Sequence, residues 1–300
     1  MSGTVSKTVL VTGATGFLGR RLCAYYHEKG WSVRALARRT DLYPFTRPGI
    51  ALYKGNLPDE IDAEAFRGAE VVIHAAYTTR LTSKAEAERV NEQGTLNVHA
   101  LARKAGVGRF VFISSVGAHA GAESLYGRSK YALEKKMDPA RDLIIRPGLI
   151  IGPGEQGSFN RMRLQVEKLG VMPIFNGGRQ ILQTIHIDDL CRAIDLAVEK
   201  GLTGTLVVAE TAGLTLRVFL EQLASRAAKT CRFIPLPLGP TLAMLRVIEA
   251  LHIPFPLTSE NLLGLKQMIH MDSARDLARI GITVKTADES LRTLGVGESR

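Results

Sequence analysis

The sequence predicts an α/β protein in which helices cover both faces of a doubly wound, mostly parallel sheet, with a smaller C-terminal part that binds substrate. Three observations carry this prediction. Short apolar runs recur along the first two thirds of the chain, helical stretches separate them, and the first run leads directly into a glycine-rich turn. Strands that are apolar throughout and alternate with helices are typical of parallel sheets buried on both faces.

The predicted elements follow one another in a regular order. The first strand, at 8–11, leads through the glycine-rich turn into a helix that ends before Gly30, a common stop signal. Further strands are predicted at 32–37, 71–74, 109–114, 143–145 and 206–208, and a long helix at 84–104.

One apolar segment lies outside this alternation, at residues 241–251. Its side chains Leu242, Leu245, Ile248 and Leu251 share one face of a predicted helix. We expect this helix to cap the substrate side of the protein rather than to lie on a membrane surface, because its polar face is not rich in basic residues.

Composition excludes several classes of protein. With 300 residues, 45% of them hydrophobic and 23% charged, the chain has an ordinary globular composition and is neither disordered nor fibrous. No apolar run approaches the roughly 20 residues of a membrane span, and the polar start lacks the features of a signal peptide. Cys23, Cys191 and Cys231 lack metal-ligand spacing, so we expect buried thiols, no metal site and a cytoplasmic location.

The charge balance is basic, with 39 Lys and Arg residues against 29 Asp and Glu residues and a net charge of +10. These basic residues are scattered, and no basic stripe with interleaved aromatic residues is present. We therefore expect a small-molecule substrate, with anionic compounds favoured, and no nucleic-acid partner.

The turn after the first strand carries the most specific motif. Gly13, Gly16 and Gly19 recur every three residues, with Thr15 and the pair 17–18 (Phe17, Leu18) between them. Gly13 permits a tight turn, Gly16 lets the backbone approach a diphosphate at the helix N-terminus, and Gly19 lets the helix pack closely on the sheet. An apolar strand before the motif and an amphipathic helix after it make it a specific prediction of dinucleotide binding.

This turn resembles the TGxxGxxG fingerprint of the short-chain dehydrogenase/reductase superfamily. Its place at the start of a chain of this length resembles the extended branch, which includes nucleotide-sugar epimerases, dehydratases and reductases. The resemblance implies a Rossmann domain, expected at 1–152 and 180–210, and a substrate-binding part, expected at 153–179 and 211–300. A homodimer is expected as well, because family members often pair through two helices of the cofactor domain.

The end of the second strand bears on the choice of cofactor. Arg38 and Arg39 follow this strand, and no acidic residue lies between Lys29 and Asp41. A carboxylate at this place would hold the ribose 2′-hydroxyl of NAD, whereas a guanidinium pairs with the 2′-phosphate of NADP. We therefore predict NADP in preference to NAD.

Other stretches resemble segments that contact the cofactor in this superfamily. The resemblance implies a short adenine-contacting segment at 56–57, small residues after the third strand and a serine at the end of the fourth strand. It also implies a nicotinamide-side stretch after the fifth strand, where backbone groups can bond the carboxamide. The residues concerned are Asn56, Leu57, Ala75, Ala76, Tyr77, Ser114, Pro147, Gly148, Leu149 and Ile150. His74 is interpreted as structural.

Hydride chemistry at a carbinol or carbonyl carbon needs a group that moves a proton at the oxygen. A tyrosine does this when a lysine one helical turn away lowers its pKa, which is the logic of the Tyr-x-x-x-Lys spacing. The pairs that match start at Tyr25, Tyr126 and Tyr131. Tyr25 lies on the first helix, behind the glycine turn. Tyr131 lies about 140° around the helix from Tyr126, so both cannot face one site.

The resemblance favours the pair Tyr126 and Lys130, which follows the fourth strand. It implies that Tyr126 is the general acid and base, that Lys130 tunes it and also holds the nicotinamide ribose, and that Ser115 orients the substrate oxygen. Ser114 is the alternative to Ser115, and Tyr131 the alternative to Tyr126.

The leading prediction is an NADP-dependent oxidoreductase, with a nucleotide-sugar epimerase or dehydratase and a non-catalytic NADP-binding regulator or assembly subunit as alternatives. Two departures weaken the nucleotide-sugar interpretation. Only 11 residues separate Ser115 from Tyr126, and Leu182 stands where epimerases of this type usually have a diphosphate-binding arginine, with Arg179 nearby. The sequence does not identify the substrate.

Overall fold

The structure is a computed structural model that describes residues 6–38, 49–78, 84–253 and 257–294. It divides into two compact units by its internal contacts. Unit 1 comprises Met1–Ser114, Ala132–Ile145 and Ile194–Leu206, and unit 2 comprises Ser115–Tyr131, Arg146–Ala193 and Val207–Arg300. The predicted domain boundaries, drawn from the resemblance, stay a prediction.

A mostly parallel sheet organises unit 1, as the alternation of elements predicts. Within the described residues its strand order is β12-β7-β6-β5-β1-β2-β3-β4, so the order reverses on either side of the central β1. Its strands are β1 (Thr8–Thr12), β2 (Ser32–Ala37), β3 (Ile50–Asn56), β4 (Glu60–Ile61), β5 (Val71–His74), β6 (Arg109–Ile113), β7 (Leu143–Pro147) and β12 (Gly204–Val208). Such a reversal is the switch point beside which doubly wound sheets bind ligands.

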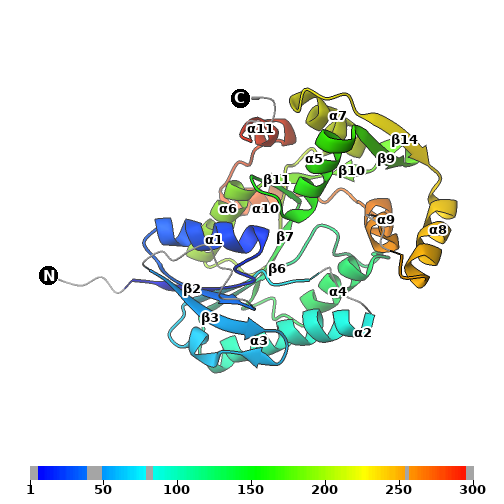
Figure 1. Cartoon of the computed structure of the whole chain (residues 1–300). Coiled ribbons are helices and arrows are strands. Elements are labelled where there is room, and N and C mark those ends of the chain that lie inside the picture. Colours follow the sequence, from blue (N-terminus) through cyan, green and yellow to red (C-terminus); the bar gives the residue numbers. More distant parts are fainter. Residues whose placement is uncertain (1–5, 39–48, 79–83, 254–256, 295–300) are drawn as a thin grey trace. The chain divides into compact units, whose positions relative to one another are not determined.

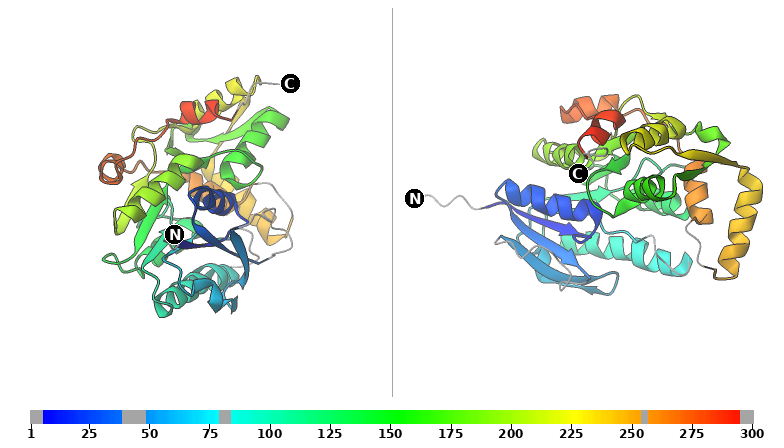
Figure 2. Two further views of the ribbon diagram at one scale, coloured as in Figure 1. Left: turned by 90° about the vertical axis from the view of Figure 1, so that its left-hand side faces the viewer. Right: turned by 45° about the horizontal axis from the view of Figure 1, so that its top comes forward.

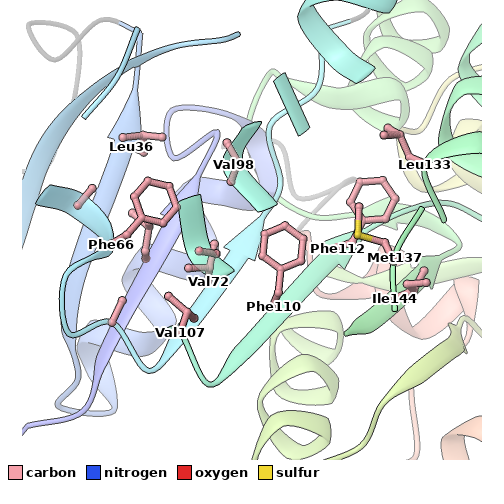
Figure 3. Close-up of a cluster of buried hydrophobic side chains, with 14 residues drawn as sticks. Leu36, Phe66, Val72, Val98, Val107, Phe110, Phe112, Leu133, Met137 and Ile144 are labelled. Carbon is pink, nitrogen blue, oxygen red and sulfur yellow. The ribbon is translucent and has the colours of Figure 1, made fainter. Parts of the chain in front are cut away.

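Helices lie on both faces of this sheet. Figure 1 shows α1 (Phe17–Glu28) above strands β1–β3 and α3 (Gly94–Lys104) below them. The core on the α3 side is drawn in Figure 3, where one layer contains in turn Phe66 of the short helix η1 (Ala63–Phe66), Val98 of α3, and Phe110 and Phe112 of β6. All four side chains are buried, so this layer removes large apolar surfaces from water and fixes the strands whose ends carry the predicted site.

The predicted helix at 84–104 is interrupted. It divides into α2 (Lys84–Ala87), a π-helical turn η2 (Glu88–Gln93) and α3. The Asn91 amide within the π turn bonds both the N–H and the carbonyl of Thr78, at 2.9 Å each. The extra residue of the π turn therefore lies where the helix contacts the segment after β5, a connection that periodicity does not reveal.

Unit 2 is built from short strand pairs and helices. Parallel pairs join β8 (Leu149–Ile151) to β11 (Thr184–His186) and β9 (Val171–Phe175) to β14 (Arg232–Leu236), and an antiparallel pair joins β10 (Ile181–Leu182) to β13 (Leu214–Thr215). Its helices are α4 (Leu125–Glu134) and α6 (Ile187–Glu199), which both continue into unit 1, and α5 (Gly157–Leu169), α7 (Leu216–Arg226), α8 (Leu238–Ala250), α9 (Ser259–Lys266), α10 (Ala274–Ile280) and α11 (Ala287–Arg292).

The predicted apolar face of the 241–251 helix is partly wrong. Leu245 is buried and Leu242 packs beside it in a cluster with Leu262 of α9, and α8 and α9 lie side by side in Figure 2. Leu251, by contrast, is 64% exposed and lies at the C-terminal cap of α8. The apolar contact with α9 is made by Leu242 and Leu245, whereas Leu251, after the last turn, presents apolar surface to solvent.

No helix in the part of the chain that the structure describes combines the length and the hydropathy needed to cross a membrane.

A buried ion cluster fastens α3 to the segment before β7. The Asp142 carboxylate accepts hydrogen bonds from His99 at 3.0 Å, from Arg103 at 2.6 Å and from the Asp138 N–H at 2.8 Å. Burial alone would raise the pKa of Asp142, but the hydrogen bonds and the charges of His99 and Arg103 outweigh it and hold the pKa below its ordinary value. The charged form is therefore the one that stabilises the fold.

We expect Asp142→Asn to lower the free energy of unfolding by about 3 kcal/mol at neutral pH, because Arg103 loses its buried partner. The pKa of Asp142 is lower in the folded protein than in the unfolded chain, where it is 3.8. The stability that Asp142 contributes is therefore complete above pH 3.8 and is lost as the pH falls through the pKa of the folded state. Urea unfolding across pH measures both effects. Glu221→Gln, in the exposed pair with Arg217, is the control and should change stability by less than about 0.5 kcal/mol. An equal loss in both variants would contradict the expectation.

Candidate active site

The turn between β1 and α1 has the geometry that the three glycines predict. Gly13 has a φ of +65°, and a Cβ atom on it would lie 2.7 Å from Ala76 Cα. A Cβ on Gly19 would lie 2.1 Å from the Gly13 carbonyl oxygen, and one on Gly16 would lie 3.1 Å from the same atom. Gly19 therefore allows the helix to approach the turn itself, whereas the prediction assigned that close approach to the sheet.

The N-terminus of α1 fits a diphosphate. Within this fully described helix, the N-cap residue Gly16 has no side-chain cap, and the first turn carries no acidic residue. Its N–H groups and the positive end of the helix dipole are thus left for an anion. Arg20 Nε donates to the Thr15 carbonyl at 2.9 Å, which holds the turn in place, and Phe17 and Leu18 supply the first helical N–H groups.

A hydrogen-bond chain fixes the end of β5 against this turn. His74 Nδ1 lies 2.8 Å from Thr12 Oγ1, which accepts from the Ala76 N–H, and His74 Nε2 lies 3.0 Å from Thr95 Oγ1, which donates to the Asn91 carbonyl. Since Thr95 gives its proton to the Asn91 carbonyl, His74 Nε2 is the donor to Thr95 Oγ1. This agrees with the interpretation of buried His74 as structural.

The remaining cofactor candidates of unit 1 lie at strand ends. Arg38 is exposed directly after β2, and Arg39 lies outside the described residues. Asn56 is exposed at the end of β3, while Leu57 packs partly into the core beside α3. Ala75 and Tyr77 follow β5 and are half-buried.

The structure brings Ser115 and Tyr126 together in unit 2. Their side chains share a hydrogen bond, and the Gly117 N–H donates to Ser115 Oγ at 3.0 Å, so Ser115 uses its own proton toward the phenol oxygen. Lys130 lies one turn after Tyr126 on α4 and is 3% exposed. Ser115 follows β6 by two residues, at the carboxyl edge of the sheet where doubly wound proteins hold their ligands.

Two effects oppose each other at the Tyr126 phenol. Desolvation raises its pKa above the ordinary value, although 36% of the residue is exposed, and the hydrogen bond from Ser115 lowers it. The net pKa is raised in the chain alone. A catalytic tyrosine needs a lowered pKa, which the ammonium of Lys130 and the positive charge of an oxidised nicotinamide would supply.

The rejected pair Tyr25 and Lys29 has another task in unit 1. The Tyr25 hydroxyl donates to Asp195 at 3.0 Å, and Lys29 contacts the same carboxylate at 2.5 Å and Glu199 at 2.9 Å. These contacts raise the pKa of Lys29 to about 12 despite the opposing effect of desolvation. The pair therefore ties α1 to α6. Tyr131 lies on α4 next to Lys130, five residues after Tyr126.

Ser114, the alternative serine, has a buried partner that the sequence did not indicate. Its hydroxyl donates to Glu134 Oε1 at 2.5 Å, and Ser114 and Glu134 are 2% and 7% exposed. Glu134 lies one helical turn after Lys130 on α4. Ser114 thus links the end of β6 to α4, which distinguishes it from Ser115 on the phenol side.

Two N–H groups of the nicotinamide-side stretch are used within unit 2. The Gly148 N–H donates to the Val208 carbonyl at 3.2 Å, and the Leu149 N–H donates to the Gln183 carbonyl at 2.8 Å. These two N–H groups are therefore not available to a carboxamide. Pro147 accepts from the Val116 N–H at 3.1 Å, which fastens this stretch to the residue after Ser115, and Ile150 pairs with β11.

Leu182 and Arg179 differ in their surroundings. Leu182 is 2% exposed and packs in the core of unit 2, so its position faces apolar side chains. Arg179, at the C-cap of the short helix η3 (Asn176–Gly178), is exposed.

Comparisons with known proteins agree with this geometry. A model of the NAD dependent epimerase/dehydratase family matches residues 9–209. A ceramide reductase of Caulobacter vibrioides (strain NA1000 / CB15N) is 36% identical over 187 residues, which cover 60% of this chain and only 57% of that protein. A 4-hydroxy-2-methyl-3-oxo-4-farnesyl-3,4-dihydroquinoline-1-oxide ketoreductase of Stigmatella aurantiaca is 29% identical over 238 residues, 71% of each chain.

The fold also matches solved structures. A UDP-glucose 4-epimerase from Thermotoga maritima, solved with UDP-glucose, has a TM-score of 0.74 at 21% identity and covers 97% of this chain and 98% of its own. At this identity the likeness shows the fold alone. The family match, by contrast, extends over two thirds of the chain and includes both the glycine turn and the Tyr126 helix. The chain therefore belongs to the NAD-dependent epimerase/dehydratase family, within the extended short-chain dehydrogenase/reductases.

Proposed function

We propose that the chain is an NADP-dependent oxidoreductase that transfers a hydride between the cofactor and a carbonyl or carbinol carbon of a small molecule. The observation that carries this proposal is the hydrogen bond between Ser115 and Tyr126 at the start of α4, with buried Lys130 one turn further on. These residue types in this order supply a proton donor, a group that orients the substrate oxygen and a positive field.

The residues have separate tasks in the reduction. Bound NADPH supplies the hydride. When substrate is bound, the Ser115 hydroxyl turns its single proton from the phenol to the carbonyl oxygen and orients that oxygen. Tyr126 Oη gives its proton to the same oxygen as the new C–H bond forms. The product is an alcohol, and the phenolate left on Tyr126 is stabilised by the Lys130 ammonium until solvent returns the proton. The glycine turn holds the diphosphate through the N–H groups of α1.

Two findings support net reduction over epimerisation. The two relatives named above are a ceramide reductase and a ketoreductase. Leu182 is buried among apolar side chains at the place where a diphosphate-binding arginine is expected in a nucleotide-sugar epimerase. A homodimer, a cytoplasmic location and an anionic substrate stay predictions.

A turnover assay tests the proposal. The chain is incubated with NADPH and a panel of ketones that includes long-chain and aromatic compounds, and loss of absorbance at 340 nm is followed. We expect oxidation of NADPH with at least one ketone and none with UDP-glucose or UDP-galactose. Interconversion of the two sugars without net use of cofactor would favour an epimerase. Tight NADPH binding without turnover on either panel would favour a binding subunit.

Arg38→Ala tests the choice of cofactor. We expect it to weaken NADPH binding about 10- to 100-fold and to leave NADH binding unchanged, because a charge-assisted bond to the 2′-phosphate is lost. Isothermal titration calorimetry measures both affinities. Arg67→Ala, which removes another exposed arginine of unit 1, is the control and should change neither. Wild-type protein with equal affinity for NADPH and NADH would overturn the NADP assignment.

A further inference from the structure

The loop between Ser115 and Tyr126 is fastened by a segment far along the chain. Gln267, directly after α9, accepts the Glu123 N–H through its side chain, and its carbonyl lies 3.3 Å from His119 Nε2. Lys266 Nζ contacts both carboxylate oxygens of Glu123, at 2.8 and 3.0 Å. All these residues belong to unit 2, and they hold the loop in place although it is short.

The first turn of α4 is capped from two sides. Ser124 Oγ accepts the Gly127 N–H at 3.2 Å, which is the ordinary N-cap bond within the helix. Glu260 Oε2 of α9 accepts the Leu125 N–H at 2.5 Å. Tyr126 lies between these two capped residues, and Figure 1 shows α9 beside the start of α4. The orientation of the helix turn that bears the phenol therefore depends on a carboxylate from another element.

The helix that supplies this carboxylate is itself firmly held. Its N-terminus has a capping box between Thr258 and Asn261, and both the N–H and the hydroxyl of Ser259 donate to Glu249 of α8 at 2.6 Å. Leu262 of α9 is buried in the cluster shared with α8. A rigidly placed α9 can fix the position of its Glu260 carboxylate, which an exposed side chain on a loose segment could not.

We propose that Glu260 is a positioning residue for Tyr126: by accepting the Leu125 N–H it fixes the first turn of α4 so that the phenol stays in hydrogen-bond contact with Ser115. This inference rests on the proposed function only because that function assigns the proton transfer to Tyr126. Glu260 itself touches no reacting atom.

Three variants of Glu260 separate its possible contributions. Glu260→Ala removes the acceptor, and we expect kcat to fall about 10- to 100-fold with the Kd for NADPH unchanged, since a small misplacement of a catalytic group has such effects. Glu260→Gln keeps an oxygen acceptor at the same reach and should restore kcat to within about threefold. Glu260→Asp keeps the charge but withdraws the carboxylate by one methylene, and should resemble Glu260→Ala. Glu221→Ala, which breaks an exposed pair with Arg217 on α7, is the matched control and should leave kcat unchanged.

Two further readouts need no substrate. Hydrogen exchange of the peptide 117–131 should be faster in Glu260→Ala and unchanged in Glu260→Gln. The Tyr126 pKa, followed by NMR of ¹³C-labelled tyrosine and assigned with Tyr126→Phe, should rise in Glu260→Ala by up to about 0.7 pH unit. The reason is that the hydrogen bond from Ser115, which lowers this pKa, is weakened.

The outcomes distinguish this inference from the proposed function. If wild-type protein turns over no ketone, the proposed function fails. Hydrogen exchange of the peptide 117–131 and the Tyr126 titration then still decide the role of Glu260. If wild-type protein is active and Glu260→Ala matches it in kcat, exchange and Tyr126 pKa, the positioning role is wrong and the function stands. Equal losses in Glu260→Ala and Glu260→Gln would also overturn it, because a charge rather than the acceptor would then matter.

Discussion

Tyr126→Phe should reduce turnover by about 10³-fold and leave NADPH binding unchanged. The substitution keeps the ring and removes only the hydroxyl that shares a hydrogen bond with Ser115. Without that hydroxyl no group on α4 next to Ser115 can give a proton to the substrate oxygen as the hydride arrives. Steady-state kinetics give kcat, and calorimetry gives the Kd for NADPH.

Tyr131→Phe is the matched control, because this tyrosine lies on the same helix and also precedes a lysine, Lys135, by four residues. It should leave kcat within about threefold of wild type, since it lies about 140° around the helix from Tyr126. The opposite result, with Tyr131→Phe inactive and Tyr126→Phe active, would show that the second pair performs the chemistry.

Gly19→Ala should weaken NADPH binding about 100-fold. The added methyl carbon would lie 2.1 Å from the Gly13 carbonyl oxygen, so either α1 or the glycine turn must move. Overpacking of this kind costs up to about 3 kcal/mol, and a shift of the turn displaces the N–H groups that would hold the diphosphate. Calorimetry with NADPH measures the affinity, and thermal unfolding measures any loss of stability.

Gly264→Ala provides the control for this prediction. Gly264 is an exposed residue of α9, and a Cβ atom on it meets nothing within 4 Å. Alanine there should leave NADPH affinity unchanged and stabilise the helix by about 0.5–1 kcal/mol. If Gly19→Ala bound NADPH as tightly as wild type, the turn would not be the diphosphate site.

Local sequence patterns were enough to predict the part of the fold in which strands and helices alternate regularly. The strands at 32–37 and 71–74 are confirmed residue for residue, because each is a compact run that is apolar or mostly apolar and is bounded by a turn signal. Gly13, which was predicted to permit a tight turn, has a φ of +65°. By contrast, β3 was not predicted, since its residues are mostly half-buried or exposed and its sequence includes Lys54 and Gly55.

The contacts around Tyr126 were beyond sequence reasoning for another reason. Glu260 and Leu125 are separated by 135 positions, and Ser114 and Glu134 by 20. Each pair is brought together by packing of whole elements, which spacing within one element does not encode. The Tyr-x-x-x-Lys spacing together with the family resemblance favoured Tyr126, whereas the tertiary fold determines what holds this residue and how its pKa is balanced.

The most direct test is a crystal structure of the chain soaked with NADPH. We predict density for the diphosphate beside the N–H groups of Thr15, Phe17 and Leu18, and for the 2′-phosphate beside Arg38. A glycine turn left vacant while NADPH binds elsewhere would contradict the assignment of this turn as the cofactor site.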